Sequence, residues 1–121
     1  MQESGENYLE TILIMKNKYG FVRSIDIANE LGYTKPSISR AMSILKKAEY
    51  IKIAANGNIT LTPKGLELAN SIYERHQYIS KFLTQSLGVN PQTADMDACR
   101  IEHIISRETM EKIKAYVDKN K

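Results

Sequence analysis

One change of pattern, at residues 50–62 (YIKIAANGNITLT), limits what this chain can fold into more than any other feature. Residues typical of β-strands lie on both sides of Asn56-Gly57, and Asn-Gly between two such runs is the strongest short-range signal for a β-hairpin. The segments before and after it have helical spacing instead. The chain is therefore expected to combine several helices with one isolated hairpin.

Two helices are predicted first. Apolar residues recur at helical spacing in residues 6–18, and the helix ends at Gly20. Residues 23–32 predict a second, shorter helix, with Ser24 as its N-cap and Gly32 just past its end. The residues expected to face inward in this second helix are Ile25, Ile27, Ala28 and Leu31.

A third helix is predicted within residues 33–51, where Thr34 can act as N-cap and Pro36 suits the first turn. Its apolar stripe consists of Ile38, Met42 and Leu45. Two short helices joined by a tight turn that contains Gly are typical of a helix-turn-helix. The hairpin that follows is then the wing of a winged helix-turn-helix.

The sequence after residue 62 has the spacing of helices only. A long helix follows Pro63 and ends near Leu87, and residues 90–105 and 106–121 predict two more. The fold class is therefore mainly α: a winged helix-turn-helix followed by an all-helical domain. The only plausible boundary lies near residue 62, which divides the chain into residues 1–62 and 63–121.

Positive charge is concentrated around the predicted helix-turn-helix and wing. Residues 34–65 carry six basic side chains and one acidic one, whereas residues 66–121 carry eight of each. Such a block is expected of a surface that faces nucleic-acid phosphates. The alternative is a solvated basic face without a partner.

The second helix of a helix-turn-helix enters the major groove with its N-terminal residues at the base edges. The side chains expected there are Thr34, Lys35, Ser37, Ser39 and Arg40. Hydroxyl groups suit phosphates and bases, and Arg can bind guanine through two hydrogen bonds. Lys46, Lys47 and Lys52 are expected near phosphates. The alternative is a solvated helix end that Thr and Ser cap.

Three potential metal ligands, Cys99, Glu102 and His103, share one face if residues 90–105 form a helix. Their sulfur, oxygen and nitrogen donors suit a divalent transition ion. His76 occupies an apolar position on another helix and is a candidate fourth ligand. Asn7 and Glu10, one turn apart on the first helix, could complete the site. The alternative is a buried thiol, a hydrogen-bonded core histidine and two surface residues.

Other classes of protein fit less well. Neither long apolar run approaches the roughly 20 residues of a membrane span, and no signal peptide is visible. With a single cysteine the chain forms no internal disulfide, so a cytoplasmic location is expected. Cys-x-x-Glu-His differs at one position from the His-x-x-Glu-His of inverted zinc peptidases, but the first histidine is missing. The chain is not expected to be an enzyme.

The chain resembles the metal-dependent repressors of the diphtheria toxin repressor family, which includes the manganese transport regulators. The resemblance is to the short form without an SH3-like domain. It covers nearly the whole sequence, and ERHQYISKFL followed by DACRIEHIIS is its most specific part. It implies a homodimer that reads a palindromic operator, with residues 1–62 on DNA and residues 63–121 pairing the subunits. It also implies Fe²⁺ or Mn²⁺ as corepressor.

Carried over by position, the implied metal ligands are His76, Cys99, Glu102, His103, Glu10 and the residue at position 7. The implied DNA-facing residues are Thr34, Ser37 and Arg40, with Pro36 opening the recognition helix. The implied genes are those of metal uptake or efflux. The rival reading is a metal-independent winged-helix regulator that keeps the scaffold and has lost the sensor.

The sequence departs from both branches of this family. The manganese branch has acidic residues at positions 7 and 99, and the iron branch has Met and Cys there, whereas this chain has Asn7 and Cys99. The iron branch's second metal site also needs a Glu and a His at the positions of Ser80 and Asp95. The soft sulfur of Cys99 and the neutral oxygen of Asn7 favour Fe²⁺ over Mn²⁺ as the bound ion. Zn²⁺, Co²⁺ or Ni²⁺ could replace Fe²⁺ in vitro.

Overall fold

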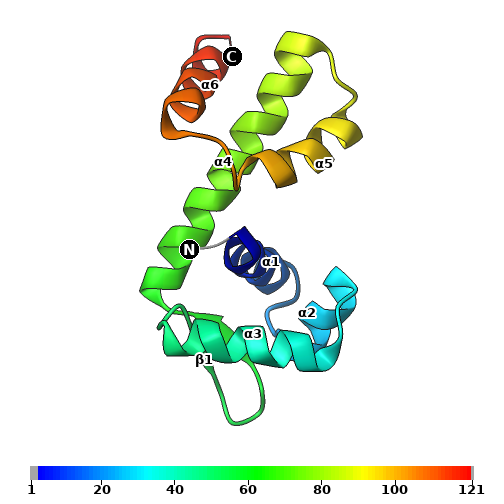
Figure 1. Ribbon diagram of the computed structural model, residues 1–121, viewed down its shortest axis with the longest axis vertical. Helices are drawn as coiled ribbons and strands as arrows, with labels where there is room; N and C mark the ends of the chain where they lie inside the picture. The colour runs from blue at the N-terminus through cyan, green and yellow to red at the C-terminus, as the bar shows by residue number, and fades with distance from the viewer. Residues whose placement is uncertain (1–2, 121) are drawn as a thin grey trace. The chain divides into compact units, whose positions relative to one another are not determined.

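The computed structural model describes residues 3–120 and is mainly α-helical with one two-stranded sheet, as the sequence predicts (Figure 1). The elements are α1 (Glu3–Tyr19), α2 (Ser24–Leu31), α3 (Lys35–Lys47), β1 (Ile51–Ile53), β2 (Ile59–Leu61), α4 (Pro63–Leu87), α5 (Pro91–Ile101) and α6 (Arg107–Lys119). The chain forms two compact units, Met1–Asn70 and Ser71–Lys121, and α4 runs from the first into the second. Within residues 3–120, no helix combines the length and apolar character that a bilayer crossing requires.

The N-terminal unit is built on one apolar core that all its elements share. α2 packs against α3, and α1 packs against β2. The buried core residues are Leu9, Ile12, Leu13, Met15, Val22, Ile27, Ala28, Ile38, Met42, Leu45, Ile51, Ile59 and Ala69. The stripe predicted for the third helix is therefore confirmed, since its three members are all in this core.

The start of α2 differs from the prediction. Arg23, not Ser24, is the N-cap residue, and its backbone N–H donates to Asp26 Oδ2 (2.9 Å). Ile25 is 41% exposed instead of facing inward, because Ile27 and Ala28 occupy the core-facing positions of this eight-residue helix. Gly32 then takes a left-handed conformation (φ 71°), which produces the tight turn into α3.

The wing is an antiparallel pair with Ile51 opposite Leu61 and Ile53 opposite Ile59. The Gly57 N–H donates to the Ala54 carbonyl (2.9 Å), and Gly57 has a φ of 87°. This is the geometry of a turn followed by a left-handed glycine, a longer connection than the two-residue loop that Asn-Gly most often forms. The predicted hairpin is confirmed.

Asn58 ties the wing to the end of the first helix. Its Oδ1 accepts hydrogen bonds from Lys16 Nζ (2.9 Å) and from the Val22 backbone N–H (3.2 Å). The Ile59 N–H also donates to the Val22 carbonyl (2.7 Å). These bonds fix the base of the wing against the rest of the unit.

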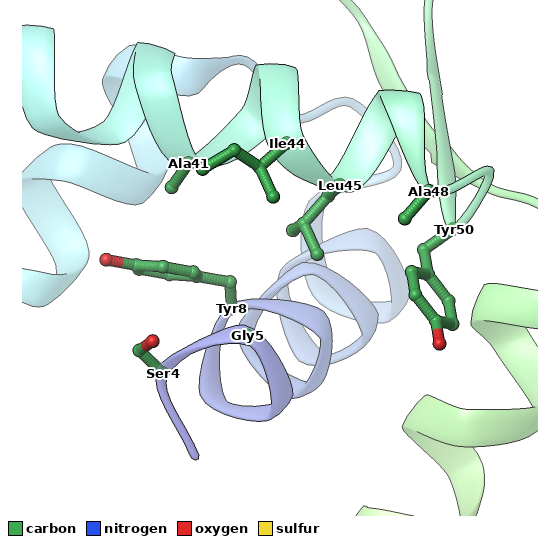
Figure 2. Close-up of a pocket in the computed structure, with 8 residues that line it drawn as sticks. All are labelled: Ser4, Gly5, Tyr8, Ala41, Ile44, Leu45, Ala48 and Tyr50. Atoms are coloured by element: carbon green, nitrogen blue, oxygen red, sulfur yellow. The ribbon is translucent and has the colours of Figure 1, made fainter. Parts of the chain in front are cut away.

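An open groove lies between the start of α1 and α3 (Figure 2). Figure 2 shows Tyr8 of α1 below Ala41 and Leu45 of α3, with Tyr50 at the far end. The residues that line the groove are Ser4, Gly5, Tyr8, Ala41, Ile44, Leu45, Ala48 and Tyr50. These described residues contribute apolar and hydroxyl groups to its lining.

Gly65 lies in the first turns of α4, where the helix crosses the chain just before β1. A Cβ at this position would overlap the carbonyl oxygen of Tyr50. The junction is also held by Thr62, whose hydroxyl donates to the Glu49 carbonyl (2.6 Å) and accepts from the Gly65 N–H (3.1 Å). The glycine of the segment ITLTPKG is therefore required by a close approach of two backbones.

Gly65→Ala is expected to lower the free energy of unfolding by about 1–3 kcal/mol, because the added methyl group displaces backbone atoms. In an uncrowded helix the same change would stabilise by about 1 kcal/mol, so the sign of the effect is decisive. Urea denaturation provides the measurement. Glu67→Ala, at an exposed position of the same helix, is the control and should stay within about 0.5 kcal/mol of wild type.

The C-terminal unit consists of the second part of α4, α5 and α6. Its buried core residues are Ile79, Ala98, Met110, Ile113 and Val117. Asn90 caps α5 by accepting from the Gln92 N–H (2.9 Å), and Ser106 caps α6 by accepting from the Thr109 N–H (3.2 Å). The predicted helix over residues 90–105 is too long, because α5 ends at Ile101.

Candidate DNA-binding face and metal centre

The residues predicted to meet DNA are all exposed, and most lie on one part of α3. Thr34 is the N-cap of α3: its Oγ1 accepts from the Ser37 N–H (3.3 Å) and donates to Ser37 Oγ (2.9 Å). Pro36 stands in the first turn, as predicted. The exposed set is Thr34, Lys35, Pro36, Ser37, Ser39, Arg40, Lys46 and Lys52. The first turns of α3 therefore present hydroxyl and cationic groups to solvent.

A shallow hollow at the base of the wing gathers further cations. Lys46 of α3, Lys52 of β1 and Lys64 of α4 all line it. Lys64 was not singled out from the sequence, where it counted only toward the charge of residues 34–65. Its Nζ donates to the Ala48 carbonyl (3.0 Å) and lies 4.3 Å from the centre of the Tyr50 ring. Lys64 is thus held in place at the surface, and all three lysines are exposed.

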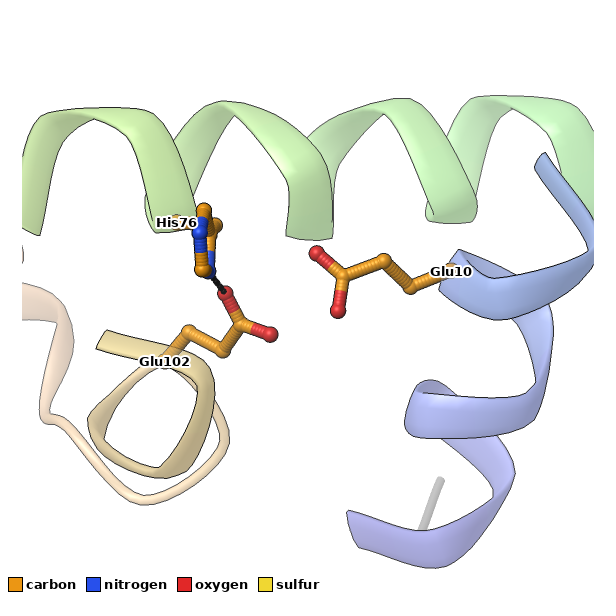
Figure 3. A group of neighbouring side chains, drawn as sticks. All are labelled: Glu10, His76 and Glu102. Atoms are coloured by element: carbon orange, nitrogen blue, oxygen red, sulfur yellow. Dashed lines mark hydrogen bonds and ion pairs between the residues drawn. The ribbon is translucent and has the colours of Figure 1, made fainter. Parts of the chain in front are cut away.

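The C-terminal unit brings together three of the six predicted metal ligands. His76 Nδ1 of α4 lies 3.0 Å from Glu102 Oε2, and Glu102 Oε1 lies 3.3 Å from His103 Nε2. The exposed fractions of these side chains are 15% for His76, 0% for Glu102 and 2% for His103. Figure 3 draws the His76–Glu102 pair, with Glu10 of α1 among the labelled residues. A fully buried carboxylate thus has an imidazole at each oxygen.

The end of α5 explains how both Glu102 and His103 turn inward. The Glu102 N–H still makes the helical bond to the Ala98 carbonyl (3.0 Å), but the next two N–H groups bond three residues back. The regular helix therefore ends before Glu102 and His103, which lie in the turn after α5 and not within the helix predicted for residues 90–105. The tighter turn instead buries the side chains of both Glu102 and His103.

The other three predicted ligands belong to α5 and α1. Cys99 is partly buried on α5, one turn before Glu102. Asn7 and Glu10 lie one turn apart on α1, which belongs to the N-terminal unit. The backbone carbonyl of Asn7 accepts from the Thr11 hydroxyl (2.8 Å).

His76 has carboxylates at both ring nitrogens. The hydrogen bond to Glu102 is the largest of the effects that raise the pKa of His76 from 6.5 to about 9. Burial acts in the opposite direction, and the hydrogen bond from Nε2 to Asp95 Oδ1 (2.6 Å) adds to the increase. At neutral pH the ring therefore carries a proton that a metal ion must displace.

These residues fit a divalent metal ion. Within residues 3–120, Glu102 Oε1 is buried and makes no hydrogen bond, although His103 Nε2 is 3.3 Å away. A buried carboxylate oxygen without a hydrogen bond is unfavourable, and a cation is the kind of ligand that satisfies it. Imidazole nitrogen and carboxylate oxygen are both ligands that Mn²⁺, Fe²⁺ and Zn²⁺ accept.

The winged helix-turn-helix, its exposed cationic helix and the helical unit that follows place the chain in the class of winged-helix DNA-binding regulators. The chain belongs to the iron-dependent repressor family. Residues 1–58 match the family's N-terminal DNA-binding domain, and residues 62–121 match its metal-binding and dimerisation domain.

Relatives agree with this assignment, and a solved structure shares the fold. An uncharacterized HTH-type transcriptional regulator of Methanocaldococcus jannaschii is 33% identical, over 100% of this chain and 98% of its own. The transcriptional regulator MntR of Salmonella typhimurium is 32% identical, over 95% of this chain and 73% of its own. The fold is similar to a manganese-dependent transcriptional repressor solved in complex with manganese, with a TM-score of 0.87, 23% identity and coverage of 94% and 52%. The chain thus spans about half the length of that structure.

Proposed function

We propose that this protein is a metal-responsive transcriptional repressor that binds a palindromic DNA operator as a homodimer. The observation that carries the proposal is the buried carboxylate of Glu102 between two histidines, in a chain whose other unit is a winged helix-turn-helix. The corepressor is Fe²⁺ or Mn²⁺, and the regulated genes are those of metal homeostasis.

The first turns of α3 are proposed to read the operator. Arg40 is exposed one turn after Pro36, where a bidentate contact with a guanine is possible. Thr34, Lys35, Ser37 and Ser39 supply shorter contacts to bases or phosphates. Lys46 and Lys52, at the base of the wing, face backbone phosphates. In this division of the chain, residues 1–62 bind DNA and residues 63–121 pair the subunits.

The metal is proposed to act without touching DNA. His76, Glu102 and His103 supply buried ligands, Cys99 supplies sulfur, and Glu10 and Asn7 of α1 supply further oxygen. An ion that takes ligands from both halves of the chain restricts the arrangements available to the winged helix. A dimer must present two recognition helices about 34 Å apart, so such a restriction raises DNA affinity.

Cys99 is expected to decide which metal works. Its thiolate is a soft ligand, so the wild type should respond to Fe²⁺ at lower concentration than to Mn²⁺. Cys99→Glu replaces sulfur with oxygen and should shift activation toward Mn²⁺. The measurement is a titration of operator binding against each ion, anaerobic for Fe²⁺, with Cys99→Ser as a second variant. If Mn²⁺ activates wild type best and Cys99→Glu changes nothing, the argument from ligand softness is wrong.

The protein is expected to be a dimer paired through residues 63–121, because two copies are needed to read a palindrome. Sedimentation velocity at micromolar concentration, with Zn²⁺ present, should show a species of twice the 13.8 kDa chain mass. A monomer under these conditions contradicts the proposed subunit arrangement.

The same proposal gives the protein a regulatory role and no catalytic one, and it places the protein in the cytoplasm. A repressor acts where the chromosome is, which implies the cytoplasm.

A further inference from the structure

Asp95 is an exposed residue that contacts His76, one of the proposed metal ligands. It lies on α5 between the buried residues Ala94 and Ala98, and its own side chain is 66% exposed. Even so, its Oδ1 lies 2.6 Å from His76 Nε2, the shorter of the two carboxylate contacts of that ring. Holding an exposed carboxylate in one hydrogen bond costs side-chain entropy, so this contact suggests a role beyond packing.

The two nitrogens of His76 face different surroundings. Nδ1 faces Glu102, whose other oxygen lies against His103, so the buried ligands gather on that side. Nε2 faces Asp95 near the surface. An imidazole can bind a metal through one nitrogen only, and the other N–H is normally held by a carboxylate or carbonyl that orients the ring. The buried oxygen and the second imidazole identify Nδ1 as the metal side.

We propose that Asp95 is a positioning residue of the metal centre: it accepts the Nε2–H of His76 and thereby directs Nδ1 at a single ion. This inference rests on the proposed metal site. It gives a role to a position where the iron-type resemblance implies a histidine of a second metal site. A carboxylate oxygen that already accepts an imidazole N–H is poorly placed to bind a second ion.

The test uses Zn²⁺, which is diamagnetic, and the full-length chain. Long-range ¹H–¹⁵N spectra of the Zn²⁺-loaded protein should show His76 bound through Nδ1, with the proton on Nε2. Coordination through Nε2 overturns the inference. This spectrum reports directly which nitrogen of His76 binds the ion and which carries the proton. If Asp95 had a merely structural role, its replacement would leave both unchanged.

Variants at position 95 complete the test. Asp95→Ala should weaken Zn²⁺ binding by about 10–100-fold without changing the number of ions bound, as expected for a group that orients a ligand. Asp95→Asn keeps an acceptor oxygen and should lose less. Asp97→Ala is the matched control: the same helix, the same charge and an exposed side chain. It should stay close to wild type, and circular dichroism should confirm that each variant folds.

Three outcomes separate the claims. Equal Zn²⁺ affinities for Asp95→Ala and Asp97→Ala overturn the role of Asp95 and leave the proposed function intact. Two ions in wild type and one in Asp95→Ala would make Asp95 a direct ligand and also overturn it. Absence of Zn²⁺ binding in wild type contradicts the proposed function, and the inference with it.

Discussion

Replacing Glu102 with Gln is expected to weaken metal binding by more than about 100-fold, beyond the loss caused by changing a group that only orients a ligand. Gln has nearly the same shape, so the packing around position 102 is kept. The change removes the negative charge at the two oxygens that face His76 and His103. A neutral amide binds a divalent cation far less well than a carboxylate does.

Isothermal titration with Zn²⁺ and with Mn²⁺ measures this effect directly. Glu108→Gln, in the exposed first turn of α6, makes the same chemical change away from the cluster and should leave affinity unchanged. Thermal denaturation without metal should show that Glu102→Gln is folded. Wild-type affinity in a folded Glu102→Gln variant would remove this residue from the metal site.

Arg40→Ala is expected to lower specific DNA affinity by about 1–3 kcal/mol, the loss of one bidentate base contact. Because every 1.4 kcal/mol is tenfold, this corresponds to roughly 5- to 150-fold. Arg40 is exposed on α3, and the buried stripe of Ile38, Met42 and Leu45 faces the other way, so truncation leaves the core intact. The loss should therefore appear in DNA binding and not in stability.

Lys46→Ala is the matched comparison on the same helix. It should weaken binding to all sequences alike and reduce the salt slope of binding by about one. The measurement is the affinity for the protein's own upstream DNA and for a scrambled duplex, at several salt concentrations. If Arg40→Ala leaves the ratio between the two duplexes unchanged, Arg40 does not read bases.

The N-terminal unit was largely predictable because its signals are local. The bond between Thr34 and Ser37 spans one helical turn, and the wing depends on a left-handed glycine at position 57. Ile25 was misplaced because apolar spacing in an eight-residue helix cannot show which of several apolar residues the neighbouring helices cover. The requirement for glycine at position 65 could not be predicted either, because it comes from the close approach of the Tyr50 backbone, 15 residues earlier in the chain.

The metal centre was predictable in its residue types and less so in its geometry. His76 stood out as a histidine in an apolar stripe, and Glu102 and His103 as ligands close together. The end of α5 at Ile101 was not foreseen, because residues 98–105 contain neither Gly nor Pro to stop a helix. The contact of Asp95 with His76 joins residues 19 positions apart on two helices, and no local pattern encodes it.

The central claim is that metal controls DNA binding. The most direct measurement is the affinity of the full-length protein for its own upstream DNA, in chelator and with Mn²⁺, Fe²⁺ or Zn²⁺ added. Coupling between two sites is typically about 5- to 150-fold, so at least one ion should tighten binding by that factor. Equal affinity in chelator and in every metal, with an intact dimer, would contradict the account and identify a metal-independent winged-helix regulator.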